Sequence, residues 1–436
     1  MADDLRSRIA HLARRSGFGA TPAEIDASVA RGYDATVDAL FDPSPDPGAD
    51  ATPAPTTFAL IAPLPRVSGE EKKAANAVKK TQNYALVRWW LDRMTATQRP
   101  LNEKMALFWH GHFATGLSKV DEASFMLRQN EIFRSLGLTR FEPLAQAVAK
   151  DPAMLVWLDA NDNKKGSPNE NFARELMELF TIGIGSYTDG DVREAARAFT
   201  GTRVDRKTGT TFVNPNQTDK TAKTILGQTQ PFAFEAAVSF LANRPESAAF
   251  VSAKLWSRFA YPVAVTDPVV ADLAGVFRQN GELTAVMKGL FRHPQFVSTQ
   301  ARQGLIKQPI EWVVGAMRAV GMRANEFEVV GPDPVPALRE LNQIPFDPPS
   351  VGGWPQNGYW LSTATALSRL RYANALANRA NLGWLTGVAA AGRPDALAHQ
   401  LGIDGWSGST ASGLKSAPSP KAQLVIALTS PEYVLA

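Results

Sequence analysis

Apolar residues recur every three or four positions through most of the chain, which is the spacing of amphipathic α-helices. In the clearest example, just before Pro100, these positions are Tyr84, Val87, Trp90, Leu91 and Met94. Residues typical of β-strands are concentrated only near 202–227, where Gly209 precedes Thr210 to Val213 and favours a hairpin. The pattern therefore predicts a mainly α protein, with one large multi-helix domain and a small β-hairpin insertion.

Changes in composition divide the 436 residues into five consecutive segments. They are N-terminal helices (1–41), a strap or linker rich in Pro and Ala (42–69), a helical core domain that contains the β insertion (70–401), a linker rich in Gly and Ser (402–420) and a C-terminal helix that packs on the core (421–436). A chain of this length can bury a large core.

Charge and composition narrow the class of protein. The net charge is +4 and is spread along the chain, which argues against a nucleic-acid partner. Cysteine is absent, which excludes disulfides and a cysteine nucleophile. The first residues lack the apolar run of a signal peptide, and no stretch reaches the roughly 18 apolar residues of a membrane span. We expect a soluble protein, cytoplasmic as the sequence stands, or exported if a leader has been removed.

One predicted helix, over residues 167–180, gathers polar side chains on one face. At about 100° per residue, Asn171, Glu175 and Glu178 fall on one stripe, and Arg174 lies at its edge. Two buried carboxylates about one helical turn apart raise one another's pKa, so that one of them can act as a general acid. We interpret these four residues as candidate catalytic groups. A solvated face, or a network of glutamates and arginines, is the structural alternative.

The two histidines of FWHGHF, His110 and His112, are candidate metal ligands. On a continuous helix, residues two apart point about 200° from each other and cannot share a metal ion. If the helix ends at Gly111, both rings could turn toward one point and, with carboxylates, hold a divalent metal ion. The alternative is a structural role at the C-terminus of a helix.

A loop near 347–360 is dense in Pro, Gly and Trp. Trp354, Tyr359 and Trp360 are candidate substrate-binding residues, because their rings could stack on a sugar or another flat ligand. Packing of these rings against the core is the alternative.

Six segments together resemble the bacterial family catalogued as domain of unknown function 1800. They are HLARRSGFG at 11–19, FWHGHF at 108–113, NENFARELMELF at 169–180, YTDGDV at 187–192, KLW at 254–256 and PPSVGGWP at 348–355. The resemblance covers nearly the whole chain. It implies a mainly helical fold and, for many members, an export leader and a partner that is similar to a phosphatase or sulfatase. It also favours convergence of the two histidines with Glu175 and Glu178 at one site.

This chain departs from the family pattern at one position. Relatives carry a His-Asp pair where this sequence has Thr218 and Asp219. If that histidine is a ligand or base in relatives, this protein has lost it.

Taken together, these features predict an enzyme, with a hydrolase favoured. Its site of histidines and glutamates would hold a divalent metal ion or work by acid–base chemistry on a glycan or another polar polymer. One alternative is a non-catalytic partner that binds a glycan or a protein. Another is an oxidoreductase that depends on iron or haem held through histidine.

Overall fold

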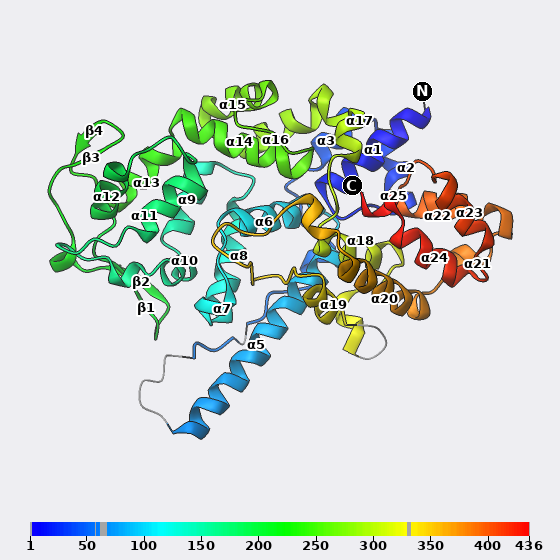
Figure 1. Cartoon of the computed structure of the whole chain (residues 1–436), viewed down its shortest axis with the longest axis horizontal. Helices are drawn as coiled ribbons and strands as arrows, with labels where there is room; N and C mark the ends of the chain where they lie inside the picture. Colours follow the sequence, from blue (N-terminus) through cyan, green and yellow to red (C-terminus); the bar gives the residue numbers. More distant parts are fainter. Residues whose placement is uncertain (1, 57, 62–67, 329–332, 436) are drawn as a thin grey trace.

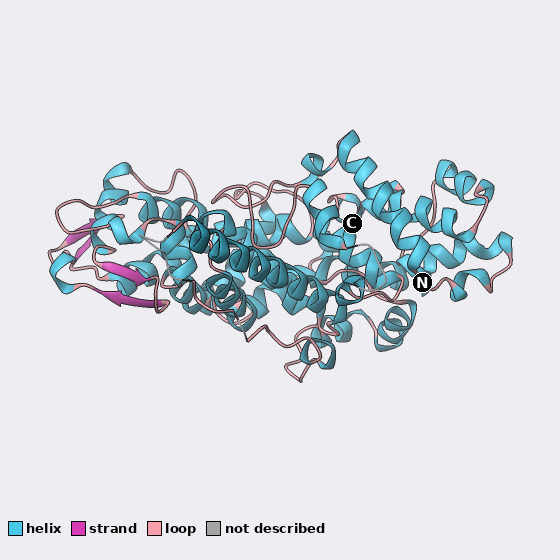
Figure 2. Cartoon of the chain, turned by 90° about the horizontal axis from the view of Figure 1, so that it is seen from below, coloured by secondary structure: helices cyan, strands magenta, loops and turns pink. Residues whose placement is uncertain are grey.

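The computed structural model describes residues 2–56, 58–61, 68–328 and 333–435. Figure 1 shows an elongated body of helices, with both termini in one half and the β-strands at the opposite end. Figure 2, seen from below, shows strands only at that end. The predicted fold class is therefore confirmed: the protein is mainly α, with a small β insertion. None of the helices in the described ranges combines the length and hydropathy that crossing a bilayer requires.

The N-terminal helices are α1 (Ala2–Ser16), α2 (Pro22–Arg31), α3 (Tyr33–Ala39) and α4 (Pro47–Asp50). A capping box starts α2, because the Thr21 hydroxyl accepts the Glu24 N–H at 3.3 Å and the Glu24 carboxylate accepts the Thr21 N–H at 2.7 Å. The predicted strap at 42–69 includes 57 and 62–67, which lie outside the described residues. Within its described part, the Asp46 carboxylate caps α4 and accepts the N–H of Gln98 at 3.0 Å, so it ties this segment to the body.

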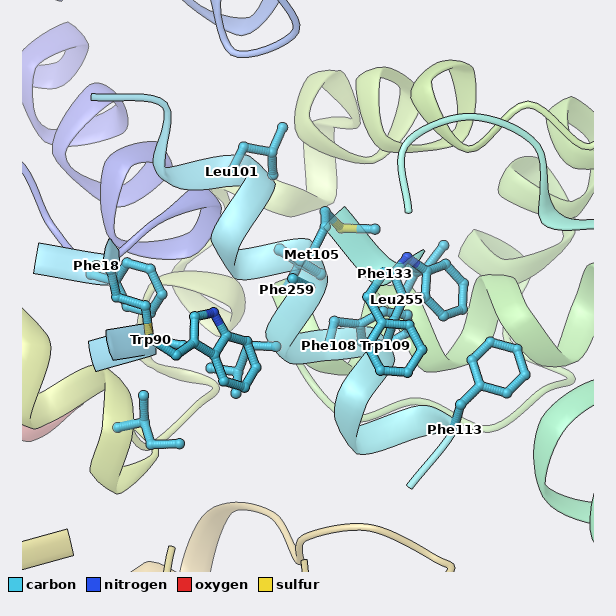
Figure 3. Close-up of a cluster of buried hydrophobic side chains, with 14 of the residues drawn as sticks. Phe18, Trp90, Leu101, Met105, Phe108, Trp109, Phe113, Phe133, Leu255 and Phe259 are labelled. Carbon is cyan, nitrogen blue, oxygen red and sulfur yellow. The ribbon is translucent and has the colours of Figure 1, made fainter. Parts of the chain in front are cut away.

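Two helices form the centre of the molecule, α5 (Gly69–Ala96) and α6 (Pro100–His112). The first half of α5 stands away from the body in Figure 1. Ten of the 13 residues of α6 are buried, so this helix is covered on nearly every side. Figure 3 shows its Met105, Phe108 and Trp109 among apolar side chains from other segments.

The expectation that α6 ends at Gly111 is wrong, because the helix continues to His112. The loop at 341–362 presses on this glycine from outside: a Cβ atom at Gly353 would lie 2.1 Å from the Gly111 carbonyl oxygen. Gly353 has φ +79°, a conformation that glycine adopts without strain. Gly353 thus allows the loop to approach the helix closely, whereas a Cβ atom at Gly111 would make only an ordinary contact, 3.7 Å from a ring carbon of Trp354.

The remaining helices surround α6 and extend to both ends of the body. Up to the middle of the chain they are α7 (Leu117–Val120), α8 (Ala123–Leu136), α9 (Phe141–Ala149), α10 (Pro152–Trp157), α11 (Asn171–Glu175), the π-helix η2 (Leu176–Thr181) and α12 (Asp189–Ala198). After the strands they are α13 (Phe234–Ala242), α14 (Pro245–Phe259), α15 (Pro268–Asn280), α16 (Leu283–Arg292), α17 (Thr299–Gln303), α18 (Pro309–Ala319), α19 (Pro334–Glu340), α20 (Thr363–Arg379), α21 (Gly383–Thr386), α22 (Arg393–Leu401), α23 (Gly408–Ser416), α24 (Pro420–Thr429) and α25 (Pro431–Val434). Short 3-10 turns connect several of them: η1 (Ala160–Asp162), η3 (Pro215–Gln217), η4 (Pro294–Val297), η5 (Ala324–Glu328), η6 (Asn357–Trp360) and η7 (Ala390–Gly392).

The β insertion contains two antiparallel hairpins in the described part of the chain rather than the one expected. In the first, β1 (Thr202–Asp205) pairs with β2 (Thr210–Val213), with Thr202 opposite Val213. In the second, β3 (Lys223–Ile225) pairs with β4 (Gln228–Gln230). Gly209, at φ +69°, lies in the connection of the first hairpin, as the sequence predicted.

Two local expectations are wrong because tertiary contacts override them. Residues 167–170 do not begin a helix: the Asn163 carboxamide accepts the N–H of Asn169 at 3.0 Å, and Ser167 forms a bridge with Lys164, so α11 begins only at Asn171. The predicted linker at 402–420 instead contains α23, where Leu414 is fully buried and provides the apolar anchor that the composition of this segment concealed.

Candidate functional site

A cavity of about 110 Å³ lies between α6, η2, α14 and the loop at 341–362. Leu107, Phe108, Leu179 and Trp354 form apolar walls. Its polar lining side chains are His112, Lys254, Arg258, Gln308 and Gln356. None of the described residues that line it is acidic, so the walls carry an excess of positive charge.

The roof of the cavity is the loop that carries Trp354. Two of the contacts that hold it lie on α6: the backbone contact of Gly353 with Gly111, and the Phe346 N–H, which donates to Nε2 of His110 at 3.0 Å. The Trp354 indole meets the His110 ring edge to face, with 5.2 Å between ring centres. Its Nε1 is buried without a hydrogen-bond partner. The aromatic residue that the sequence singled out thus forms a wall of the cavity.

Lys254 is the most unusual group in this cavity. It lies on α14, is half-buried, and makes no hydrogen bond or ion pair with any side chain of the described residues. Its ammonium lies 5.3 Å from the centre of the Phe250 ring, a cation–π contact. Burial lowers the pKa of Lys254, because the apolar surroundings disfavour its charged form.

Arg258 follows Lys254 by one turn of α14 and is held by a buried acid. One guanidinium nitrogen lies 2.7 Å from the Glu311 carboxylate, which also forms an ion pair with Lys104. Burial alone would raise the pKa of Glu311, but the charges of Arg258 and Lys104 outweigh it and hold that pKa well below its usual range. Burial lowers the pKa of Lys104 to about 8, against the opposing charge of Glu311.

The two predicted metal ligands point into different surroundings. His110 accepts a hydrogen bond at Nε2, so this atom carries no proton. His112 lies with Nε2 at 2.9 Å from the Phe180 carbonyl oxygen, so this nitrogen donates, and its buried Nδ1 keeps an unpaired lone pair. Burial lowers the pKa of each ring to about 3, and both are therefore neutral near pH 7.

The structure does not bring these two rings to one point, because α6 runs without a break through Gly111 and places them on opposite sides. The described ranges contain no group of three or more His, Cys, Asp or Glu side chains arranged to hold a metal ion. The condition that the metal prediction needed, a helix that ends at Gly111, is thus not met.

The carboxylate stripe of α11 and η2 lies outside the cavity. Glu175 and Glu178 are half-buried but do not line it. Glu178 accepts a hydrogen bond from the Tyr187 hydroxyl, and burial, followed by the charge of Glu178, raises the pKa of Glu175. The contact with the histidines is made by Phe180 in η2: His112 binds its carbonyl oxygen, and the two rings lie 6.2 Å apart between centres.

The other two residues of the predicted catalytic face also remain outside. Asn171 is half-buried at the first position of α11. Arg174 forms ion pairs with Glu170 at 3.0 Å and with Asp189 at 3.2 Å, and its side chain is 37% exposed. These surface pairs match the structural alternative for Arg174.

The other two predicted substrate-binding residues, Trp360 and Tyr359, lie in different surroundings. Trp360 is fully buried, so the prediction that it stacks on a ligand is wrong; it packs in the core, and its carbonyl oxygen accepts a hydrogen bond from Arg369 at 3.0 Å. Tyr359 is 61% exposed and meets Trp360 edge to face, but it does not line the cavity.

Sequence reasoning missed Lys254 and Arg258 as site residues. The signal that could have found them is their spacing: two cations one helical turn apart, surrounded by apolar residues and with no acid three or four positions away. Thr218 and Asp219, where the resemblance implies a His-Asp pair, lie elsewhere. The Thr218 hydroxyl donates to the Asn214 carbonyl at 2.9 Å, and Asp219 pairs with Arg197 at 2.9 Å, outside the cavity.

Comparison with known proteins gives a family and no function. No curated protein and no solved structure matches this chain. Residues 11–435 match the family described as Protein of unknown function (DUF1800), and because this match spans nearly the whole chain, the protein belongs to that family.

Proposed function

We propose that this protein binds a ligand through one oxyanion, such as a sulfate, phosphate or carboxylate group, which enters the cavity beneath Trp354. The observation that carries the proposal is the half-buried Lys254, whose ammonium has no ion pair within the described part of the chain. An unpaired buried charge costs several kcal/mol. A ligand that supplies the opposite charge offsets this cost.

The neighbouring groups suit the same ligand. Arg258 faces the cavity, and Glu311 engages only part of a guanidinium that carries five N–H donors. Such a donor fork fits the oxygen atoms of carboxylate, sulfate or phosphate. The neutral His112 adds no competing charge. Gln356 is exposed and marks the side from which the ligand enters.

The size of the cavity bears on the rest of the ligand. Its volume of about 110 Å³ is well below the roughly 300 Å³ of pockets that enclose a small molecule. It can therefore hold a charged end group while the remainder lies outside, against the loop of Trp354. An acidic glycan, consistent with the polar polymer expected from the sequence, meets this requirement.

Titration calorimetry with sodium sulfate, phosphate and acetate at constant ionic strength tests the proposal. The wild-type protein should bind at least one of these anions, and Lys254→Met should weaken that binding roughly 10- to 100-fold, the range expected for a lost charge-assisted contact. Lys73→Met, on the exposed part of α5, is the matched control and should bind as the wild type does. No wild-type binding, or equal binding by Lys254→Met, would refute the proposal.

A hydrolase remains a second candidate, and one observation favours it. Glu175 is half-buried, and burial together with Glu178 raises its pKa, as a general acid requires. A glycosidase would need a second carboxylate across the substrate. A panel of nitrophenyl glycosides and esters should reveal activity that Glu175→Gln abolishes and Glu170→Gln retains. Elemental analysis of the same preparation tests the divalent metal, and visible absorbance tests the haem alternative.

The expected protein partner is tested separately. A partner that is similar to a phosphatase or sulfatase would act on the oxyanion esters that this cavity is suited to bind. Co-purification of the two proteins from cells that express both would support that association. Separate elution would count against it.

A further inference from the structure

A second cavity, much smaller, is also surrounded by cations. It has a volume of about 20 Å³, and Arg14, Lys307 and Arg318 are among the residues that line it. Tyr433 and Gly315 also line this cavity. None of its described lining residues is acidic. It shares no lining residue with the cavity beneath Trp354.

Lys307 is the central cation of this second cavity. It is only 7% exposed, and its ammonium has no hydrogen bond or ion pair among the described residues. The ammonium lies 3.4 Å from the centre of the Tyr433 ring. The nearest buried acid, Glu311, is already engaged by Lys104 and Arg258, so its charge is shared among several cations.

The acids that act on the other two lining cations, Arg14 and Arg318, lie outside the lining of the cavity. The Arg14 guanidinium donates to the uncharged carbonyl of Gly402, and the charge of Asp404 also acts on it. Arg318 donates to the Thr95 and Thr97 carbonyls at 3.1 and 2.8 Å. Its acidic neighbours are the half-exposed Glu24, at 3.8 Å, and Asp46, whose charges oppose the effect of burial on its pKa. Its Nε is buried without a hydrogen-bond partner.

The Tyr433 hydroxyl is likewise buried without a partner. A side chain at position 315 would leave it no room, because a Cβ atom there would lie 3.0 Å from the hydroxyl oxygen. The Phe18 carbonyl oxygen lies as close to that position, at 2.9 Å, so an acceptor as well as the hydroxyl borders the space that the glycine keeps open. The lining residues therefore include three donors without an acceptor among the described residues: the Tyr433 hydroxyl, the Arg318 Nε and the Lys307 ammonium.

Size and charge select the occupant. A volume of about 20 Å³ holds roughly one water-sized body, so sulfate, phosphate or a carboxylate does not fit. Burial, followed by the charge of Arg14, lowers the pKa of Lys307, so its charged form needs a neighbouring anion, which a water molecule does not supply. We infer that this cavity binds one monatomic anion, of which chloride has the appropriate charge and size. This inference does not depend on the oxyanion site.

Two measurements test the inference. Crystals of the full chain grown in sodium bromide should show an anomalous peak in this cavity, and crystals of Lys307→Met should not. The wild-type melting temperature should be higher in sodium chloride than in sodium gluconate of equal ionic strength by roughly 2 °C more than that of Lys307→Met. Lys73→Met controls for the loss of a lysine and should keep the wild-type difference.

Two outcomes would overturn the inference: a cavity without a bromide peak, or an equal chloride effect in wild type and Lys307→Met. If Lys307→Met does not fold, Tyr433→Phe replaces it. This variant keeps the ring beneath the ammonium and removes only the hydroxyl donor. It should lower the occupancy of bromide in the cavity, and unchanged occupancy would count against the assigned coordination.

Discussion

Replacement of Glu311 by glutamine should destabilise the protein strongly. The Glu311 side chain is only 7% exposed and neutralises both Lys104 and Arg258, the latter at 2.7 Å. In Glu311→Gln, the Lys104 ammonium keeps only the Gly17 carbonyl at 2.9 Å, and Arg258 keeps the Gln308 carboxamide at 3.3 Å. Breaking a buried pair in this way costs about 3–5 kcal/mol, since a charge is left uncompensated in the interior.

A double-mutant cycle isolates the interaction itself. Lys104→Met should cost less than Glu311→Gln, because Glu311 retains Arg258 and the Gln308 N–H at 2.9 Å. The double variant should be less destabilised than the sum of the two single variants, by about 0.5–3 kcal/mol.

Urea unfolding followed by circular dichroism and tryptophan fluorescence gives the required free energies. Glu70→Gln, at an exposed position of α5, is the matched control and should lie within about 0.5 kcal/mol of wild type. A Glu311→Gln variant that differs from wild type by less than about 1 kcal/mol, or strictly additive effects, would refute the assignment of Glu311 as the charge that holds this network together.

Three further predictions follow from the same structure. The pKa of His112 falls from 6.5 to about 3 on folding, so the unfolded chain binds more protons than the native state between these pH values. The free energy of unfolding should therefore fall as the pH drops below 6.5, by about 3 kcal/mol at pH 4 for this ring. Urea unfolding of His112→Gln at pH 7 and pH 4 should lack this contribution, and a pH dependence equal to that of wild type would contradict the prediction. Gly353→Ala places a Cβ atom 2.1 Å from the Gly111 carbonyl oxygen at φ +79°. It should lower the free energy of unfolding by at least about 1 kcal/mol and abolish the anion binding measured by calorimetry. Retained binding would show that the loop does not form the roof of the cavity. Burial raises the pKa of Asp151 to about 7, so the native state binds more protons than the unfolded state between pH 4 and 7 and loses stability as the pH rises through this window. Asp151→Asn lacks this loss, so its stability relative to wild type should increase by roughly 2 kcal/mol between pH 5 and 8. Parallel pH profiles of the two proteins from urea unfolding would argue against a buried carboxylate as the cause.

Part of the fold follows from local signals that the sequence contains. Capping boxes at Thr21 and Thr188 start α2 and α12, and each uses contacts within four residues. The predicted helix start at 167 is wrong, because Asn163, which lies outside that segment, accepts the backbone N–H of Asn169. The predicted linker at 402–420 is wrong as well, because the buried Leu414 makes a helix out of a segment whose composition is typical of a linker.

The metal prediction depended on one backbone detail that spacing could not supply. A glycine after His110 is compatible both with a helix end and with a helix packed closely against another backbone. In the folded protein the helix continues past Gly111, and Gly353, more than 200 positions later in the chain, packs against the Gly111 carbonyl. Helix continuity then separated His110 from His112.

The oxyanion cavity escaped the sequence for a different physical reason. A stripe of acids such as Glu175 and Glu178 attracts attention because it is polar, yet half-exposed acids can remain solvated and need no ligand. Lys254 lies among apolar residues, where a charge is costly, and no acid three or four positions away can neutralise it. Lys104 meets the same sequence criterion, but the fold gives it Glu311 as a partner. The sequence therefore indicates that both lysines are charges that need compensation. Only the tertiary structure shows that Lys104 is paired with Glu311 and that Lys254 has no acidic partner among the described residues.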